Sequence, residues 1–306
     1  MRSAQSDGTA SKPTGSNSGF ILVAVLWILA ALATLAAVYS VYVGNAAFAT
    51  QVNDDRLRIT NAISTGIELT AYELLAAGSG EARPPRGAFS IRLARSTINV
   101  KFVSESARVD LNRAPKALLA GLFVSVGVSS ADAAKFADRI AGWRLKANDA
   151  GQNTEADDYK NAGYDYAPRR GPFQNSLELS LVLGIPSYIA ERVLPLATVY
   201  SGIGQIDVRV ASPEVLSALP GIAPEQLQKI LKQRARDPMD AAALTRLLGA
   251  ASVWASTSPN PATRVQVQVR LDNGRSARAE AVIFVLEGQD EPFRVLSWRD
   301  DSDGSI

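Results

Sequence analysis

The first hydrophobic segment of the chain is long enough to cross a membrane. Residues 20–43 contain no charged side chain, and at about 1.5 Å of helix per residue about 20 apolar residues span the hydrocarbon core of a bilayer. A cleaved secretory signal would have a shorter apolar stretch, whereas this one continues toward an amphipathic helix. Basic residues Arg2 and Lys12 precede the segment, which predicts a cytoplasmic N-terminus and a periplasmic remainder.

The helical pattern continues beyond the apolar segment. Apolar residues recur every four positions: Ile59, Ile63, Ile67, Ala71 and Leu75. Charged residues lie between them, and Gly78 is suited to cap the C-terminal end of a helix. The pattern predicts one continuous rod, whose first half lies in lipid and whose second half packs on a globular domain.

Two groups of strands are predicted after this helix. Residues 91–93 and 98–102 alternate apolar and polar side chains, which indicates a hairpin. Near the C-terminus, residues 265–271 alternate in the same way, Asn273 and Gly274 supply a turn, and residues 281–286 and 293–298 follow as further strands. A long helix packed on an antiparallel sheet makes the predicted fold class α+β.

A helical stretch of about a hundred residues separates the two strand groups, and it contains an internal echo. Residues 109–111 lead through Ala114 and Pro115 into a leucine-rich helix, and residues 206–208 lead through Ala211 and Pro213 into another. An early proline suits the first turn of a helix. Two helical hairpins, at residues 181–194 and 219–236, are predicted within this stretch.

The junction Gly19-Phe20, followed by the apolar segment, resembles the processing site of the type IV pilin and pseudopilin superfamily. The resemblance implies that a prepilin peptidase cuts between Gly19 and Phe20, with methylation as a companion modification. Family members normally carry a glutamate at the fifth residue after the cut, where this chain has Ala24. A carboxylate at the bilayer centre costs about 2.5–3.5 kcal/mol unless it is paired. A subunit without it need not dock beneath another copy of its kind.

Further motifs make the resemblance more specific. Residues 109–115 read Val-Asp-Leu-Asn-Arg-Ala-Pro, residues 164–168 are expected to form an aromatic-rich loop, and residues 175–185 are expected to form a leucine-rich helix ending in Gly-Ile. Their order, together with Ala24, resembles the protein K class of type II secretion minor pseudopilins. The resemblance implies a subunit that caps the pseudopilus tip and helps initiate its assembly, for export of folded proteins across the outer membrane.

The resemblance also implies a domain plan and a set of partners. Residues 1–19 form a prepilin leader, 20–43 the transmembrane part of the first helix, and 44–111 the amphipathic helix with the first strands. Residues 112–205 form an inserted helical domain with helix-hairpin-helix or SAM-like units, and 206–306 the second hairpin and last strands. The expected partners are other minor pseudopilins in a tip complex, the major pseudopilin, the prepilin peptidase and the inner membrane.

Two sets of residues are predicted to act without catalysis. The apolar face that packs in the filament is expected to include Ala24, Leu26, Leu29, Leu32 and Leu35. Family members that resemble this chain bind calcium in the helical domain, and hard oxygen ligands of the kind calcium prefers gather in residues 148–158. The candidate ligands are Asp149, Glu155, Asp157 and Asp158. A solvated polar loop is the alternative interpretation.

Composition narrows the remaining possibilities. The chain contains neither histidine nor cysteine, so zinc sites, thiol nucleophiles and a histidine-dependent triad are excluded, and no enzyme activity is predicted. With 32 basic and 30 acidic residues, the charge balance requires no nucleic-acid partner. Two alternatives remain open: a type IV pilus minor pilin, and a membrane-anchored DNA-uptake receptor. The receptor would hold phosphates through its helical hairpins with Lys229, Lys232, Arg234 and Arg236.

Overall fold

The computed structural model describes residues 17–78, 83–145 and 154–301. The chain divides into two compact units, one ending at Arg58 and the other beginning at Ile59. A single helix, α1 (Asn17–Ala76), runs for 60 residues. At its end Gly78 has a φ of 76°, and its N–H donates to the carbonyl of Leu75 at 2.9 Å. Glycine adopts this left-handed conformation at little cost, and the predicted continuous helix and its cap are confirmed.

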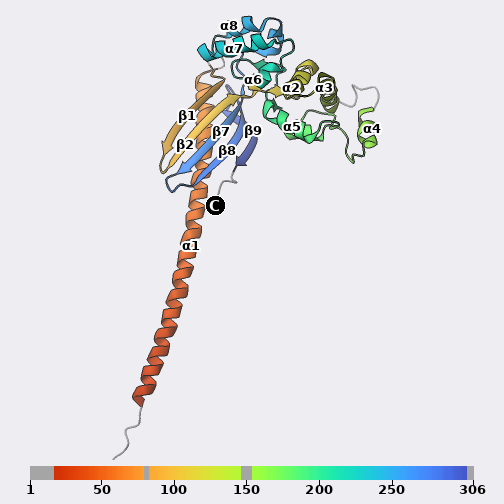
Figure 1. Cartoon of the computed structure of the whole chain (residues 1–306). Coiled ribbons are helices and arrows are strands. Elements are labelled where there is room, and N and C mark those ends of the chain that lie inside the picture. Colours follow the sequence, from red (N-terminus) through yellow and green to blue (C-terminus); the bar gives the residue numbers. More distant parts are fainter. Residues whose placement is uncertain (1–16, 79–82, 146–153, 302–306) are drawn as a thin grey trace, which may run out of the picture. The chain divides into compact units, whose positions relative to one another are not determined.

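The second unit is built around a five-stranded antiparallel sheet in the order β1-β2-β7-β8-β9 (Figure 1). Its strands are β1 (Arg86–Leu93), β2 (Ser96–Ser104), β7 (Ala262–Leu271), β8 (Ser276–Val285) and β9 (Phe293–Asp301). The predicted hairpin and the predicted C-terminal strands are confirmed, and the turn between β7 and β8 contains Gly274 at a φ of 88°. Strands from the two ends of the second unit meet where β2 pairs with β7.

The second half of α1 covers one face of this sheet. Ile63, Ile67 and Leu74 are buried against the inward-facing valines and isoleucines of β2, β7 and β8. Gly66 permits the close approach, because a Cβ atom there would lie 3.0 Å from the side chain of Val267. Burying an aliphatic side chain of this size contributes about 1.5–3 kcal/mol. The helix and sheet therefore share one apolar core.

Helices and short strands fill the chain between β2 and β7. The α-helices are α2 (Lys116–Ser125), α3 (Ser130–Arg144), α4 (Thr154–Asn161), α5 (Ser187–Val193), α6 (Pro213–Ser217), α7 (Pro224–Arg236) and α8 (Ala241–Leu248). Four 3-10 segments accompany them in the described part: η1 (Glu105–Ala107), η2 (Ser176–Leu181), η3 (Leu194–Leu196) and η4 (Gly249–Trp254). Their buried side chains form one hydrophobic cluster that extends from Val109 to Ala251. The cluster crosses residue 205, and the predicted domain limits stay predictions.

The predicted internal repetition is confirmed, and its two similar parts are called the first and the second repeat. The first begins with β3 (Val109–Asp110), which pairs in parallel with β4 (Ala197–Thr198). The second begins with β5 (Ile206–Asp207), which pairs in parallel with β6 (Ala255–Ser256). In each repeat an aspartate at the end of the strand stabilises the turn that follows. Its Oδ1 accepts the backbone N–H of the residue two positions later, at 2.8 Å for Asp110 and 2.9 Å for Asp207.

One arginine in each repeat donates hydrogen bonds to backbone carbonyls of the same turn. Arg144 donates to the carbonyl of Leu111 at 2.8 Å and to that of Ala114 at 2.9 Å. Arg234 makes the corresponding contacts from α7, and its shorter one, to the carbonyl of Ala211, is 2.5 Å. The carbonyls at the start of each helical hairpin are thereby satisfied by a guanidinium from a later helix.

The two repeats contact each other at equivalent positions. Gly121 of α2 packs so closely on Ala218, which follows α6, that a Cβ atom at Gly121 would lie 2.0 Å from the carbonyl oxygen of Ala218. Counted from Asp110 and Asp207, Gly121 and Ala218 occupy the same position in their repeats. Only glycine fits this contact, so the packing of the two repeats depends on Gly121.

Candidate functional site

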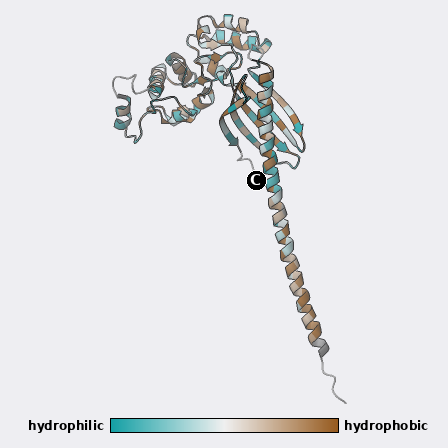
Figure 2. Ribbon diagram, turned by 180° about the vertical axis from the view of Figure 1, so that it is seen from behind, coloured by the Kyte–Doolittle hydropathy of each residue, from teal (hydrophilic) through white to brown (hydrophobic). Residues whose placement is uncertain are grey.

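The first half of α1 presents a long, exposed apolar surface within the residues that the structure describes. Its most hydrophobic window has a mean hydropathy of 2.8, and none of that window is buried within the protein. The predicted assembly residues Leu26, Leu29, Leu32 and Leu35 each expose more than half of their surface, and Ala24 is partly exposed. In Figure 2 the visible side of this part of the helix has mostly the hydrophobic colour. A helix that is apolar all round is typical of a membrane span.

In the described part of the chain, α1 is the one helix long and apolar enough to cross a membrane. Phe20 lies near its start and is 79% exposed. Gly19 belongs to the first turn of α1, whereas leader residues 1–16 lie outside the described residues. Cleavage between Gly19 and Phe20 and the assembly role of the leucines stay predictions.

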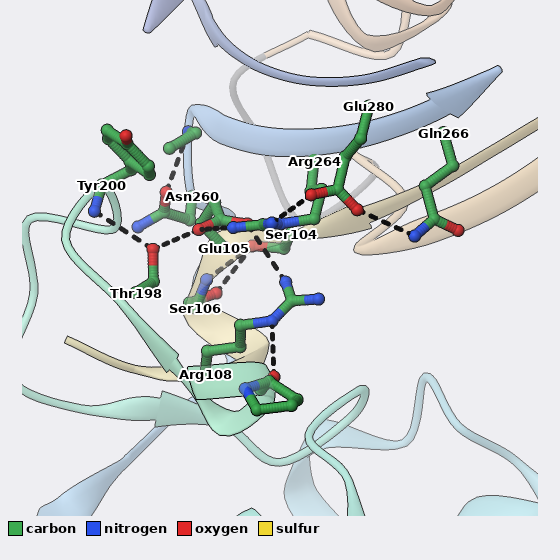
Figure 3. A network of polar contacts seen from close by, with 12 residues as sticks. Ser104, Glu105, Ser106, Arg108, Thr198, Tyr200, Asn260, Arg264, Gln266 and Glu280 are labelled. Atoms are coloured by element: carbon green, nitrogen blue, oxygen red, sulfur yellow. Dashed lines mark hydrogen bonds and ion pairs between the residues drawn. The ribbon is translucent and has the colours of Figure 1, made fainter. Parts of the chain in front are cut away.

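A buried carboxylate connects the sheet to the helical stretch. Glu105 of η1 is fully buried, and Arg264 of β7 donates to both of its oxygens, at 2.7 Å through Nε and 3.2 Å through Nη2. The hydroxyl of Thr198 on β4 donates to Oε2, and Arg108 donates to Oε1 at 3.1 Å. Figure 3 shows these side chains converging on Glu105.

The network continues outward from Arg264 and Arg108. Arg264 also forms an ion pair with Glu280 of β8, whose second oxygen accepts a hydrogen bond from Gln266 at 2.9 Å. Burial by itself would raise the pKa of Glu280, but the hydrogen bond from Gln266 and the charge of Arg264 outweigh it. The pKa of Glu280 therefore lies below its ordinary value, so the carboxylate stays charged near neutral pH.

These contacts attach the helical stretch to the sheet. Thr198 belongs to the helical side, and the carbonyl of Pro195, also on that side, accepts from Arg108 Nε at 3.0 Å. Arg264 and Glu280 belong to the sheet. We call this set, with Glu105 at its centre, the junction network. Sequence reasoning missed it, although a lone glutamate between small residues directly after a buried strand was a signal.

The acidic helix α4 carries three of the four predicted calcium ligands. Glu155 and Asp158 both pair with Arg139 of α3, at 3.2 and 2.7 Å, and Asp157 is exposed. The fourth ligand, Asp149, lies outside the described residues. A guanidinium already neutralises two of these carboxylates, so an ion bound there would have to displace it. Within the residues described, no group of three acidic side chains is arranged to hold a metal, and calcium binding stays a prediction.

An aromatic side chain anchors α4 to the rest of the helical stretch. Tyr159 is fully buried, and its hydroxyl accepts the N–H of Leu183 at 2.7 Å. Its ring contacts Trp143 and Tyr166, with centroids 6.2 and 5.8 Å apart. Burial raises the pKa of Tyr159 to about 12, because the charged phenolate would be poorly solvated.

One of the four basic residues proposed for phosphate contacts is engaged within the protein. Arg234 is half-buried and donates to backbone carbonyls at the start of α6, so its guanidinium has a structural role. Lys229, Lys232 and Arg236 are exposed on α7. This arrangement gives the DNA-receptor alternative less support than the sequence did.

Comparisons with known proteins agree with the described architecture. Residues 96–202 match the family model described as "Type II secretion system (T2SS), protein K". This segment starts at β2 and includes Glu105, α2 to α5 and Thr198. A search of curated proteins gives no significant match.

A solved structure supplies the fold match. It is a chain of the GspK-GspI-GspJ complex of the type 2 secretion system from enterotoxigenic Escherichia coli. The two chains share 15% identity and superpose with a TM-score of 0.57, over 82% of this chain and 98% of the other. At this identity the likeness establishes a common fold. Residues 96–202 are therefore similar to the protein K family of the type II secretion system, and the chain shares the fold of the Escherichia coli structure.

Proposed function

We propose that the chain is a minor pseudopilin that caps the pseudopilus tip of a type II secretion system and helps initiate its assembly. One observation carries the proposal: a single long helix, apolar on all sides over its first half, continues into an amphipathic half that packs on an antiparallel sheet. The most hydrophobic window of the apolar half is not buried against any residue that the structure describes, so this half requires lipid or the helices of other subunits.

The proposed location follows from this helix. We place the apolar half in the inner membrane, with the N-terminus in the cytoplasm and the sheet and helical stretch in the periplasm. The charges around the apolar segment support this orientation. The Escherichia coli structure contains three different proteins, which supports other minor pseudopilins as partners, beside the major pseudopilin and the prepilin peptidase.

Two features favour the tip over the shaft of a filament. Ala24 stands where a shaft subunit would carry a carboxylate to pair with its neighbour's N-terminus, so no subunit needs to lie above this one. The helical stretch adds a large body beside the sheet, held there by the junction network. A body of this size is difficult to repeat along a tightly stacked fibre.

Replacing Gly19 tests the processing step. Gly19→Leu should block cleavage, because a bulky side chain would occupy the space that the peptidase reserves for glycine. We expect a precursor of lower gel mobility and a loss of exoprotein secretion. Gly44→Leu is the matched control, since nothing lies within 4 Å of a Cβ atom built at Gly44. Normal mobility and full secretion in Gly19→Leu would contradict the proposal.

Removing the charge of Glu105 tests the junction network. Glu105→Gln leaves Arg264 and Arg108 without their buried carboxylate, and breaking a buried pair in this way costs about 3–5 kcal/mol. Urea unfolding of a fragment beginning at Ile59 measures the change. Asp138→Asn is the control, because it breaks an exposed pair with Lys116 and should cost less than about 1 kcal/mol. Equal losses would show that Glu105 does not hold the junction.

We also propose that Asp149, Glu155, Asp157 and Asp158 bind calcium, because carboxylates are the hard oxygen ligands that this ion prefers. Adding a chelator should lower the melting temperature of the purified protein, and elemental analysis should find calcium. Asp157→Asn combined with Asp158→Asn should abolish the shift, whereas Asp138→Asn should keep it. The site would be ruled out by an unchanged melting temperature together with calcium-free protein.

A further inference from the structure

The face of the sheet turned away from α1 is polar and exposed. Along β7, Val265, Val267 and Val269 are buried toward the helix, whereas Gln266 and Gln268 between them are exposed on the opposite face. Figure 1 shows the strands in front of the second half of α1, and Figure 2, from behind, shows the helix in front of the strands. An antiparallel sheet often leaves one face to solvent.

This exposed face contains a hollow of about 410 Å³. We call it the sheet-face hollow, and its polar lining includes Lys101, Gln266, Gln268, Arg278, Glu280 and Arg299. Four of these residues form one row across four strands, since Lys101 lies opposite Gln266, Gln266 opposite Glu280, and Glu280 opposite Arg299. Neighbouring strands are about 4.8 Å apart, so the backbone positions of Lys101 and Arg299 are about 14 Å apart.

The charges of the hollow do not balance. Its carboxylate, Glu280, is already engaged by Arg264 and Gln266 (Figure 3). Lys101, Arg278 and Arg299 are exposed, and among the described side chains none of them forms an ion pair. Asp301 is the register partner of Arg278, and its side chain is not described. The hollow is therefore lined by three exposed cations and by the three side-chain amides of Asn99, Gln266 and Gln268.

We propose that the sheet-face hollow binds an extended acidic segment of a partner protein. Carboxylates complement the three cations, and a distance of about 14 Å corresponds to about four residues of extended chain. The side-chain amides of Gln266 and Gln268 contain both donors and acceptors, as a peptide backbone does. The inference goes beyond the secretion role and does not depend on it.

A peptide suits the hollow better than a phosphate polymer or a lipid headgroup. Phosphates offer acceptors and no backbone N–H donors, so they would leave the amide carbonyls without a partner. DNA-binding proteins commonly make about 6–10 phosphate contacts, more than three cations supply.

Binding of a labelled acidic peptide tests the proposal. Fluorescein-labelled octaglutamate is titrated with the full chain in neutral detergent micelles, and fluorescence anisotropy gives the affinity. Lys101→Gln, Arg278→Gln and Arg299→Gln in one protein should weaken binding at least about tenfold, because three ion pairs are lost. The matched control removes three exposed cations of α7, with Lys229→Gln, Lys232→Gln and Arg236→Gln, and should keep the affinity of the unmodified protein.

Zero-length crosslinking locates the peptide. A carbodiimide joins a glutamate carboxylate to a lysine Nζ as an amide, and the carbodiimide takes up the released water as a urea. We expect mass spectrometry to find the peptide on Lys101. The proposal would be overturned by attachment mainly to other lysines, by equal losses in both triple variants, by no binding at all, or by tighter binding of inorganic polyphosphate, a DNA oligonucleotide or phosphatidylglycerol vesicles.

Discussion

The apolar surface of the first half of α1 constrains everything else in the molecule. The leucine side chains of this segment are exposed in the described part of the chain, and none of its most hydrophobic window is buried there. Leaving a single leucine in water instead of an apolar environment costs about 1.5–3 kcal/mol. Lipid tails and neighbouring apolar helices are about equally good surroundings, because helices in membranes associate through packing and not through the hydrophobic effect. A helix of this kind can therefore exchange lipid for a helical bundle at small net cost, which a filament drawn from a membrane requires.

The junction network attaches the helical stretch to the sheet on which the second half of α1 packs. Its two carboxylates and two guanidinium groups balance in charge, and their hydrogen bonds join β7 and β8 to β4. A buried ion-pair network adds little stability compared with an apolar core, but its geometry is specific. The helical stretch is thereby fixed to the sheet, and its two repeats pack on each other where Gly121 contacts Ala218.

Local patterns in the sequence predicted most of the elements. The alternation in β7 and the glycine at position 78 were sufficient for the sheet and the end of α1, because period and backbone freedom are local properties. The four-residue spacing missed Leu74, which is fully buried, since a helix repeats every 3.6 residues and its apolar stripe drifts. The lead-in to α5 folds as the 3-10 segment η2 and not as an α-helix.

Contacts between distant residues were not predictable in this way. Glu105 meets Thr198 and Arg264 across 93 and 159 positions, and only the completed fold brings them together. The same holds for Arg139, which occupies two carboxylates of the predicted calcium site. The sheet-face hollow depends on strand register, because a shift of one residue would turn Lys101 toward α1.

The position of the apolar helix during secretion tests the account most directly. The chain contains no cysteine, so Leu29→Cys introduces a single thiol that can form a disulfide with a cysteine placed in the apolar helix of another pseudopilin. The account predicts a disulfide-linked heterodimer in secreting cells, and none when the cysteine is placed at the exposed Ser276 instead. An unlinked protein that stays in the inner membrane throughout active secretion would contradict it.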